Sequence, residues 1–187
     1  MERGVPPYRQ VLGTAFEALP VELRDFHDTQ AERRWVGTCD IRQGGGALAR
    51  LLAALFGFPP PGIAVPLSVT VTPTALGETW TRDFGRSRLR STQWAGKRGD
   101  ARLLFEGFGP VSVGSVLLVE SGRLQIIPSK GSVFGVPLPA WLLPHGEAFE
   151  ASEQGCFAFD VSIHAPFVGL LVAYRGRLSL PPPDGDA

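Results

Sequence analysis

Lysine is almost missing from this 187-residue chain: Lys97 and Lys130 are the only two, and arginine supplies the rest of the 18 basic residues. The arginine bias fits either recognition of carboxylates or phosphates by planar guanidinium groups or a genome rich in G and C, since glycine and proline are also abundant. Neither charge is in excess, because 18 acidic residues bring the formal net charge to zero. Nucleic-acid partners, which need a basic surface, are therefore not expected.

Cysteine is also scarce. Cys39 and Cys156 are the only two, and they lie far apart without CxxC spacing. This pattern predicts two reduced, buried thiols rather than a disulfide framework or a metal site. The three histidines, His27, His145 and His164, form no HxH or HExxH pattern. The sequence therefore predicts neither a metal nor a cofactor.

Long hydrophobic runs are absent. The longest apolar stretch, residues 165–174, is interrupted by Pro166 and Gly169 and has the length of a strand, whereas a transmembrane helix needs about 18 apolar residues or more. The residues before Tyr8 contain no apolar segment of the kind found in signal peptides. We therefore expect a cytoplasmic protein without a transmembrane segment.

The sequence has enough apolar residues for one core. Hydrophobic residues make up 44% and charged residues 19% of the chain, and a chain of this length typically forms a single domain. We expect one β-rich domain over residues 1–180. The proline-rich end, residues 181–187, is expected to be a disordered tail.

Helical periodicity is confined to the first third of the chain. Apolar residues recur at helical spacing over residues 8–19, and a second short helix is expected over 20–28. The clearest helix, 47–56, is apolar nearly all round, so it is either buried or faces an apolar partner. The glycines at 44–46 lack the lysine and the spacing of a phosphate-binding loop, and a flexible turn is expected there.

The rest of the chain alternates apolar and polar residues in short segments separated by turn residues, which predicts strands. The expected strands are 33–41, 65–72, 78–84, 88–94, 101–108, 111–119, 123–128, 147–153, 156–164 and 169–180. Residues 138–143 are expected to form a short helical or irregular cap. The predicted fold is α+β and β-rich: a strongly curved antiparallel sheet or partly closed β-barrel of about eight to ten strands, with two or three N-terminal helices packed over it.

The segment 78–84 is the leading binding-face hypothesis. Alternation places Glu78, Trp80 and Arg82 on one face, where they would bind a polar group beneath an aromatic wall. Arg90, on the next predicted strand, would extend this face. The alternative is a surface ladder in which the tryptophan packs on the arginine stem.

A second polar strip follows the strand 156–164. Asp160, Ser162 and His164 project from one side, which either lines a cavity or faces water. They do not form a catalytic triad, because same-face neighbours along a strand lie about 7 Å apart. His27, beside Asp28, is either an oriented base or a charge that interacts with the end of its helix.

Several segments, in their order along the chain, resemble a bacterial family of domains of unknown function found alone or behind a saccharopine-dehydrogenase-like, NAD-binding domain. The resemblance covers about residues 8–180 and rests on the segments 8–13, 19–20, 26–28, 44–51, 78–85, 135–139, 159–161, 169–170 and 174–176. It implies bacterial origin, an independent domain and cooperation with a dehydrogenase-like partner, and it carries over no catalytic residues.

Three functional hypotheses follow. A curved or closed sheet leaves room for a small apolar or amphipathic ligand, with Glu78, Trp80, Arg82, Arg90, Asp160 and His164 as the ligand-binding candidates. The alternative is an accessory or interaction domain for a dehydrogenase-like NAD-binding partner, docked through the helix 47–56. The third is an enzyme that uses His27 or His164 with a nearby carboxylate.

Overall fold

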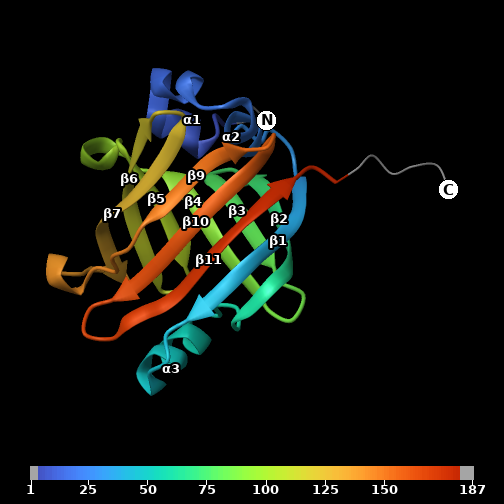
Figure 1. Ribbon diagram of the computed structural model, residues 1–187. Coiled ribbons are helices and arrows are strands. Elements are labelled where there is room, and N and C mark those ends of the chain that lie inside the picture. Colours follow the sequence, from blue (N-terminus) through green and yellow to red (C-terminus); the bar gives the residue numbers. More distant parts are fainter. Residues whose placement is uncertain (1–3, 182–187) are drawn as a thin grey trace.

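The protein is a closed antiparallel β-barrel with helices at both ends (Figure 1). The computed structural model describes residues 4–181. The strands are β1 (Arg33–Gln43), β2 (Gly62–Thr74), β3 (Gly77–Asp83), β4 (Arg88–Ala95), β5 (Leu103–Phe108), β6 (Val111–Glu120), β7 (Arg123–Val133), β8 (Val136–Pro137), β9 (Ala148–Glu153), β10 (Cys156–Ala165) and β11 (Gly169–Ser179).

Ten of these strands close the barrel, and the short β8 pairs with β7 at its edge. Each strand from β1 to β7 pairs with the next one along the chain, β7 pairs with β9, and β11 returns to β1. This connectivity is a simple meander, in which short turns join neighbouring antiparallel strands. Closure pairs the strands around the barrel, although β7 and β9 pair over only three residues each.

Alternating side chains from the strands build the core. In β1, Trp35, Cys39 and Ile41 are buried, as alternation predicts. In β2, Val69 and Val71 point inward in the same way. Because one face of each strand is apolar, the barrel interior becomes the hydrophobic core.

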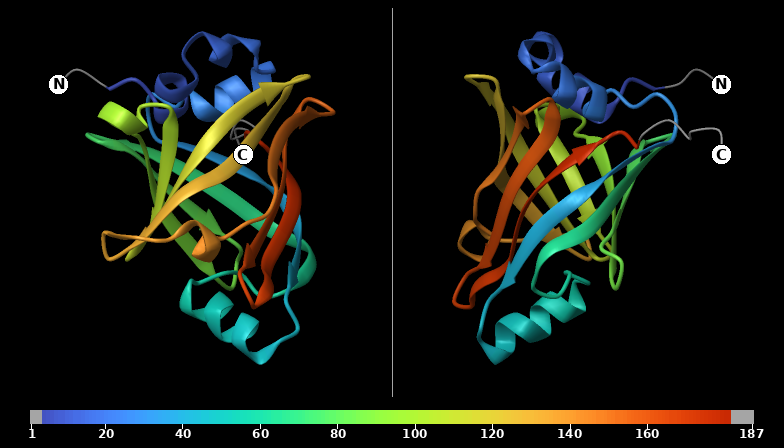
Figure 2. Two further views of the ribbon diagram at one scale, coloured as in Figure 1. Left: turned by 90° about the vertical axis from the view of Figure 1, so that its left-hand side faces the viewer. Right: turned by 45° about the vertical axis from the view of Figure 1, so that its right-hand side comes forward.

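The N-terminal helices cover one end of the barrel (Figure 2). They are α1 (Pro7–Leu12), a 3₁₀ helix (Gly13–Ala18) and α2 (Val21–His27). Phe26 of α2 stacks on Phe157 of β10 with ring centres 3.8 Å apart, and it contacts Trp35 at 4.6 Å. Tyr8 and Phe16 are also fully buried. These aromatic contacts make the helices a plug that closes this end of the barrel.

The third helix, α3 (Ala47–Leu55), lies at the opposite end of the barrel from α1 and α2 (Figure 1). It buries its small residues Ala49 and Ala53, while Leu48, Leu51 and Leu55 are 54%, 64% and 75% exposed. Alanine lets the helix backbone approach the barrel closely. The leucine face of α3 therefore points away from the core, so the first of the two expected alternatives, a buried helix, is wrong for this face.

The predicted fold class is confirmed, with two differences in the helices. The first predicted helix ends at Leu12 and continues as the 3₁₀ helix Gly13–Ala18, because Gly13 has a φ of +56° that no α-helix continues. The third helix does not join the other two. The longest described helix, α3, has nine residues, so no helix within residues 4–181 has the length and apolar character of a membrane span. All of the predicted tail except Pro181 lies outside the described residues.

Candidate functional site: a cavity inside the barrel

A cavity of about 190 Å³ lies inside the barrel between the N-terminal plug and the opposite end. Tyr8 of the plug forms its inner end, and Phe56 and Phe58, which follow α3, line it as well. Its wall is mostly apolar, with contributions from Phe108 and Ile126. An enclosed apolar space with a few polar groups is the usual form of a small-molecule site.

The cavity lies against the place where β7 and β9 part. The two strands pair over only three residues each, 123–125 with 149–151, near the N-terminal plug. Beyond this short ladder, Ile126 and Pro128 line the cavity on one side and residues 144–148 line it on the other. We take this gap in strand pairing as the opening of the cavity.

A segment that we call the strap, residues 138–147, crosses this opening. The amide of Leu138 donates to the carbonyl of Gly131 on β7 at 2.8 Å. At the other end of the strap, His145 and His164 of β10 exchange backbone hydrogen bonds of 3.0 and 2.7 Å, and their rings stack. The strap is thus tied to the barrel wall on both sides of the opening.

A partly buried ion pair lines the cavity from strands β3 and β5. Arg82 of β3 donates to Glu106 of β5 at 3.0 Å and to Ser91 of β4 at 2.8 Å. Ser91 in turn donates to the same Glu106 oxygen at 2.6 Å. The Arg82 guanidinium also lies over the ring of Trp80 at 4.9 Å. Burial by itself lowers the pKa of Arg82, but the charge of Glu106, the charge of Tyr174 and the hydrogen bond to Glu106 together outweigh it, and the pKa is raised.

A second pair, which is buried, fixes another acidic group of the cavity. His27 Nε2 lies 2.6 Å from Glu150 Oε2, and the His27 ring stacks on Tyr8 with centres 3.7 Å apart. Glu150 and Tyr8 line the cavity, whereas His27 lies behind them. Burial, with Glu150 and Glu106 adding to it, raises the pKa of Tyr8 well above its ordinary value.

Two further polar side chains are enclosed beside these pairs. Glu78 accepts a hydrogen bond from the indole of Trp80 at 3.0 Å, and burial raises the pKa of this carboxyl. Gln93 lines the cavity, and its Oε1 has no hydrogen-bond partner among residues 4–181. An unsatisfied buried amide is costly, so Gln93 is a group to which a bound molecule could hydrogen-bond.

The structure brings together half of the six sequence-predicted residues. Glu78, Trp80 and Arg82 share the inner face of β3, as alternation indicates, and Trp80 and Arg82 line the cavity. Arg90 does not join them. It pairs in register with Thr81 and lies on the outer surface, because Leu89, Ser91 and Gln93 occupy the inward positions of β4.

Asp160 and His164 lie away from the cavity. The side chain of Asp160 is 58% exposed and forms a 3.9 Å ion pair with Arg175 on the outer surface. His164 stacks on His145, beside the strap. His27 pairs with Glu150 instead of its neighbour Asp28, which accepts hydrogen bonds from Arg9. The strip on β10 is therefore divided: Asp160 and His164 do not line the cavity, whereas Ser162 between them does.

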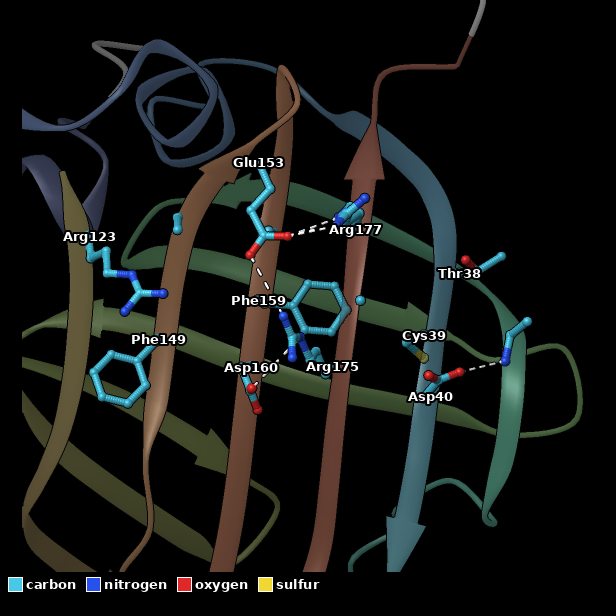
Figure 3. Close-up of a pocket in the computed structure, with 14 residues that line it drawn as sticks. Thr38, Cys39, Asp40, Arg123, Phe149, Glu153, Phe159, Asp160, Arg175 and Arg177 are labelled. Atoms are coloured by element: carbon cyan, nitrogen blue, oxygen red, sulfur yellow. Dashed lines mark hydrogen bonds and ion pairs between the residues drawn. The ribbon is translucent and has the colours of Figure 1, made fainter.

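A pocket of about 530 Å³ lies on this outer surface, across β9, β10, β11 and β1 (Figure 3). Its charged side chains pair with each other: Arg177 donates to Glu153 at 3.0 Å, and Arg175 lies 3.9 Å from Glu153. Ion pairs this exposed contribute little free energy. The pocket is an open ladder of surface charges, and it lacks the buried polar groups found inside the barrel.

Most residues of the cavity were not predicted from the sequence, among them Tyr8, Gln93, Glu106 and Glu150. Alternation alone misplaces the two glutamates, because their neighbours Phe105 and Phe149 are the apolar residues expected inside. Phe105 instead stacks on Trp94 on the outside of the barrel. Gly114 is a sequence feature that fits this facing, because a side chain there would meet the Phe105 ring. It indicates where Phe105 lies only once the register between β5 and β6 is known.

Within residues 4–181, no group of three or more His, Cys, Asp or Glu side chains is arranged to hold a metal ion. Comparison with known families gives one match: the family described as "Domain of unknown function (DUF4166)" matches residues 19–178. No curated protein and no solved structure matches the chain significantly.

Proposed function

Because the chain belongs to the DUF4166 family of domains of unknown function, we propose a function from its own geometry: the barrel binds a small apolar or amphipathic molecule in its interior. The observation that carries the proposal is the cavity itself, which is plugged at one end, lies against the gap between β7 and β9, and places Arg82, Glu106 and Glu150 beside an apolar wall.

The size of the cavity limits the ligand. An apolar cavity of about 150 Å³ in another protein accommodates benzene, so about 190 Å³ accommodates one ring or a short chain. A longer chain would have to leave the cavity beneath the strap. The ligand is thus the size of a monocyclic compound or of a short-chain amphiphile.

The polar groups argue against a cavity that is only a packing defect. Burying Arg82, Glu106 and Glu150 costs desolvation free energy, and apolar residues of similar size are often as stable or more so. Stability alone therefore gives no reason to keep charges in the interior of the barrel. Binding the polar end of a ligand does.

A cavity-filling variant tests this function. Val161 lines the cavity, so Val161→Phe places a ring in the space proposed for the ligand. Binding of toluene and of 1-octanol is measured by titration calorimetry on the wild-type chain and on the variant. We expect both compounds to bind the wild type and to bind Val161→Phe at least about tenfold more weakly, which corresponds to about 1.4 kcal/mol.

Leu118→Phe is the matched control, because Leu118 lies on a strand of the same barrel but is 46% exposed. It adds the same ring on the outside and should leave both affinities unchanged. The proposal fails if toluene, 1-octanol, octylamine and octanoate all fail to bind the wild type, or if Val161→Phe binds toluene and 1-octanol as tightly as the wild type does.

A second role is favoured by the leucine face of α3, which the barrel leaves exposed at Leu48, Leu51 and Leu55. We propose it as the docking surface for a dehydrogenase-like NAD-binding partner in the bacterial cytoplasm, the setting implied by the sequence resemblance. Leu51→Glu should abolish co-purification with such a partner, while Arg50→Glu, on the same helix, should not. Absence of any association between the wild-type proteins would refute this role.

A further inference from the structure

The interior of the cavity has more acidic than basic groups. Glu106 and Glu150 line it, and Arg82 is the basic side chain that faces them. Arg82 is already engaged by Glu106 at 3.0 Å, so its charge is largely neutralised within the pair. This leaves Glu150, whose partner His27 is charged only when protonated. The electrostatic potential at the centre of the cavity is therefore neutral or negative.

The carboxylates of Glu106 and Glu150 can also accept further hydrogen bonds. Glu106 uses one oxygen, Oε1, for both Arg82 and Ser91, and Glu150 uses only Oε2 for His27. A carboxylate has about four lone-pair sites on its two oxygens. Among the described residues, neither the second oxygen of Glu106 nor that of Glu150 has a hydrogen-bond partner, and both side chains line the cavity.

From this arrangement we propose the chemical class of the ligand: its polar end is a hydrogen-bond donor without negative charge, a hydroxyl or an ammonium group, held by Glu106 and Glu150. This inference rests on the proposed function, since it assigns the polar end of the molecule that occupies the cavity. The Gln93 amide, 2% exposed and facing the same space, provides a further hydrogen-bonding partner.

The two tyrosines of the chain show which way the cavity biases an anion: burial, Glu106 and Glu150 disfavour the tyrosinate, although Arg82 acts in the opposite direction. Tyr8 and Tyr174 both line the cavity, and burial raises the pKa of each, to about 12 for Tyr174. For both phenols, Glu106 and Glu150 add to the effect of burial. A tyrosinate in the cavity is an anion. Burial and the two nearby carboxylates, which disfavour this anion, disfavour the carboxylate of a fatty acid in the same way.

Arg82 is the group that favours a carboxylate ligand, because its guanidinium has N–H donors beyond the two that bond to Ser91 and Glu106. A carboxylate that reached these donors would also approach Glu106, and two negative charges in close contact repel each other. Because Arg82 is paired with Glu106, the cavity should bind a carboxylate ligand more weakly than an uncharged or cationic one. Removing the charge of Glu106 should reverse that selection.

The test compares three amphiphiles of one chain length, 1-octanol, octylamine and octanoate, by titration calorimetry on the full chain at neutral pH, with toluene as a probe without a polar end. We expect the alcohol, the amine or both to bind at least about tenfold more tightly than octanoate. If octanoate binds as tightly as the better of the other two, this inference is overturned while ligand binding in the barrel stands. If none of the four compounds binds, the proposed function itself fails.

Two variants make the test specific to the carboxylates. Glu106→Gln and Glu150→Gln each remove one negative charge with little change of shape, and each should improve octanoate relative to 1-octanol by about tenfold. Glu153→Gln, on the outer face of β9, is the matched control and should leave the ratio unchanged. An unchanged ratio in both interior variants overturns the inference, and the second variant keeps the test decisive if the first does not fold.

Discussion

His27 Nε2 lies 2.6 Å from Glu150 Oε2, in a buried contact between residues 123 positions apart in the sequence. It joins α2 of the plug to β9 of the barrel. His27 is fully enclosed, and the side chain of Glu150 is only 9% exposed. The pair therefore fixes the plug to the barrel wall and at the same time holds a carboxylate against the cavity.

Removing one partner of this pair should be costly. Glu150→Ala leaves the His27 ring buried without its partner, and we expect the free energy of unfolding to fall by about 3 kcal/mol. Urea denaturation followed by circular dichroism measures the change. Glu153→Ala, on the exposed face of the same strand, should cost no more than about 1 kcal/mol. Equal losses in the two variants would show that the contact does not fix the plug.

Both tyrosines of the chain are enclosed, which predicts an unusual alkaline titration. In the unfolded chain each phenol ionises near pH 10, whereas burial raises the pKa of Tyr174 to about 12 and that of Tyr8 well above its ordinary value. Tyrosinate absorbance should therefore stay low in the native protein between pH 10 and about 12, and appear near pH 10 in urea.

The same shift makes stability depend on pH. Above pH 10 the unfolded state releases protons that the native state keeps, so the free energy of unfolding should fall by about 1.4 kcal/mol per pH unit for each tyrosine until the native pKa is reached. Tyr174→Phe should remove its share of the slope. A stability that is constant from pH 9 to 11 would contradict the burial of both rings.

The two thiols should react very differently. Cys39 is 2% exposed and burial raises its pKa to about 11, while Cys156 is only partly buried. Because the thiolate is the reactive species, a thiol reagent at neutral pH should modify Cys156 in the native protein and reach Cys39 only on unfolding. Cys156→Ser should then show no fast reaction, and rapid modification of this variant would place Cys39 at the surface.

The strands could be predicted from the sequence because alternation is a local property. Phe157 and Phe159 mark the inner face of β10 without any knowledge of their neighbours. The facing of β9 could not be predicted in the same way. Phe149 is the apolar choice for the interior, yet Glu150 lies there because His27 on a distant helix satisfies it. A buried charge is placed by its partner, and the partner depends on the closed fold.

The same reason explains why only part of the site was found. Glu78, Trp80 and Arg82 lie together on one strand, so alternation groups them. The groups that complete the site come from the plug and from other strands, as Tyr8, Glu106 and Glu150 do. Which of them meet depends on register and closure, and neither can be derived from local patterns.

The strap offers the last prediction, on access to the cavity. Gly146 has a φ of +152°, and a Cβ atom there would lie 1.9 Å from the carbonyl oxygen of Ser162 on β10. Because this neighbour is backbone, Gly146→Ala should push the strap away from the barrel and break the hydrogen bonds between His145 and His164. The strap would then no longer restrain ligand exchange through the gap between β7 and β9.

Hydrogen exchange of the His145 and His164 amides should accelerate in Gly146→Ala, and 1-octanol should both associate and dissociate faster in stopped-flow measurements. Gly99→Ala is the control, since nothing lies within 4 Å of the added methyl group. Faster exchange of the two amides with unchanged ligand kinetics would mean that molecules reach the cavity by another route. Faster ligand kinetics confined to Gly146→Ala would identify the gap between β7 and β9 as the path, because the strap is tied across that gap and the N-terminal plug is untouched by the substitution.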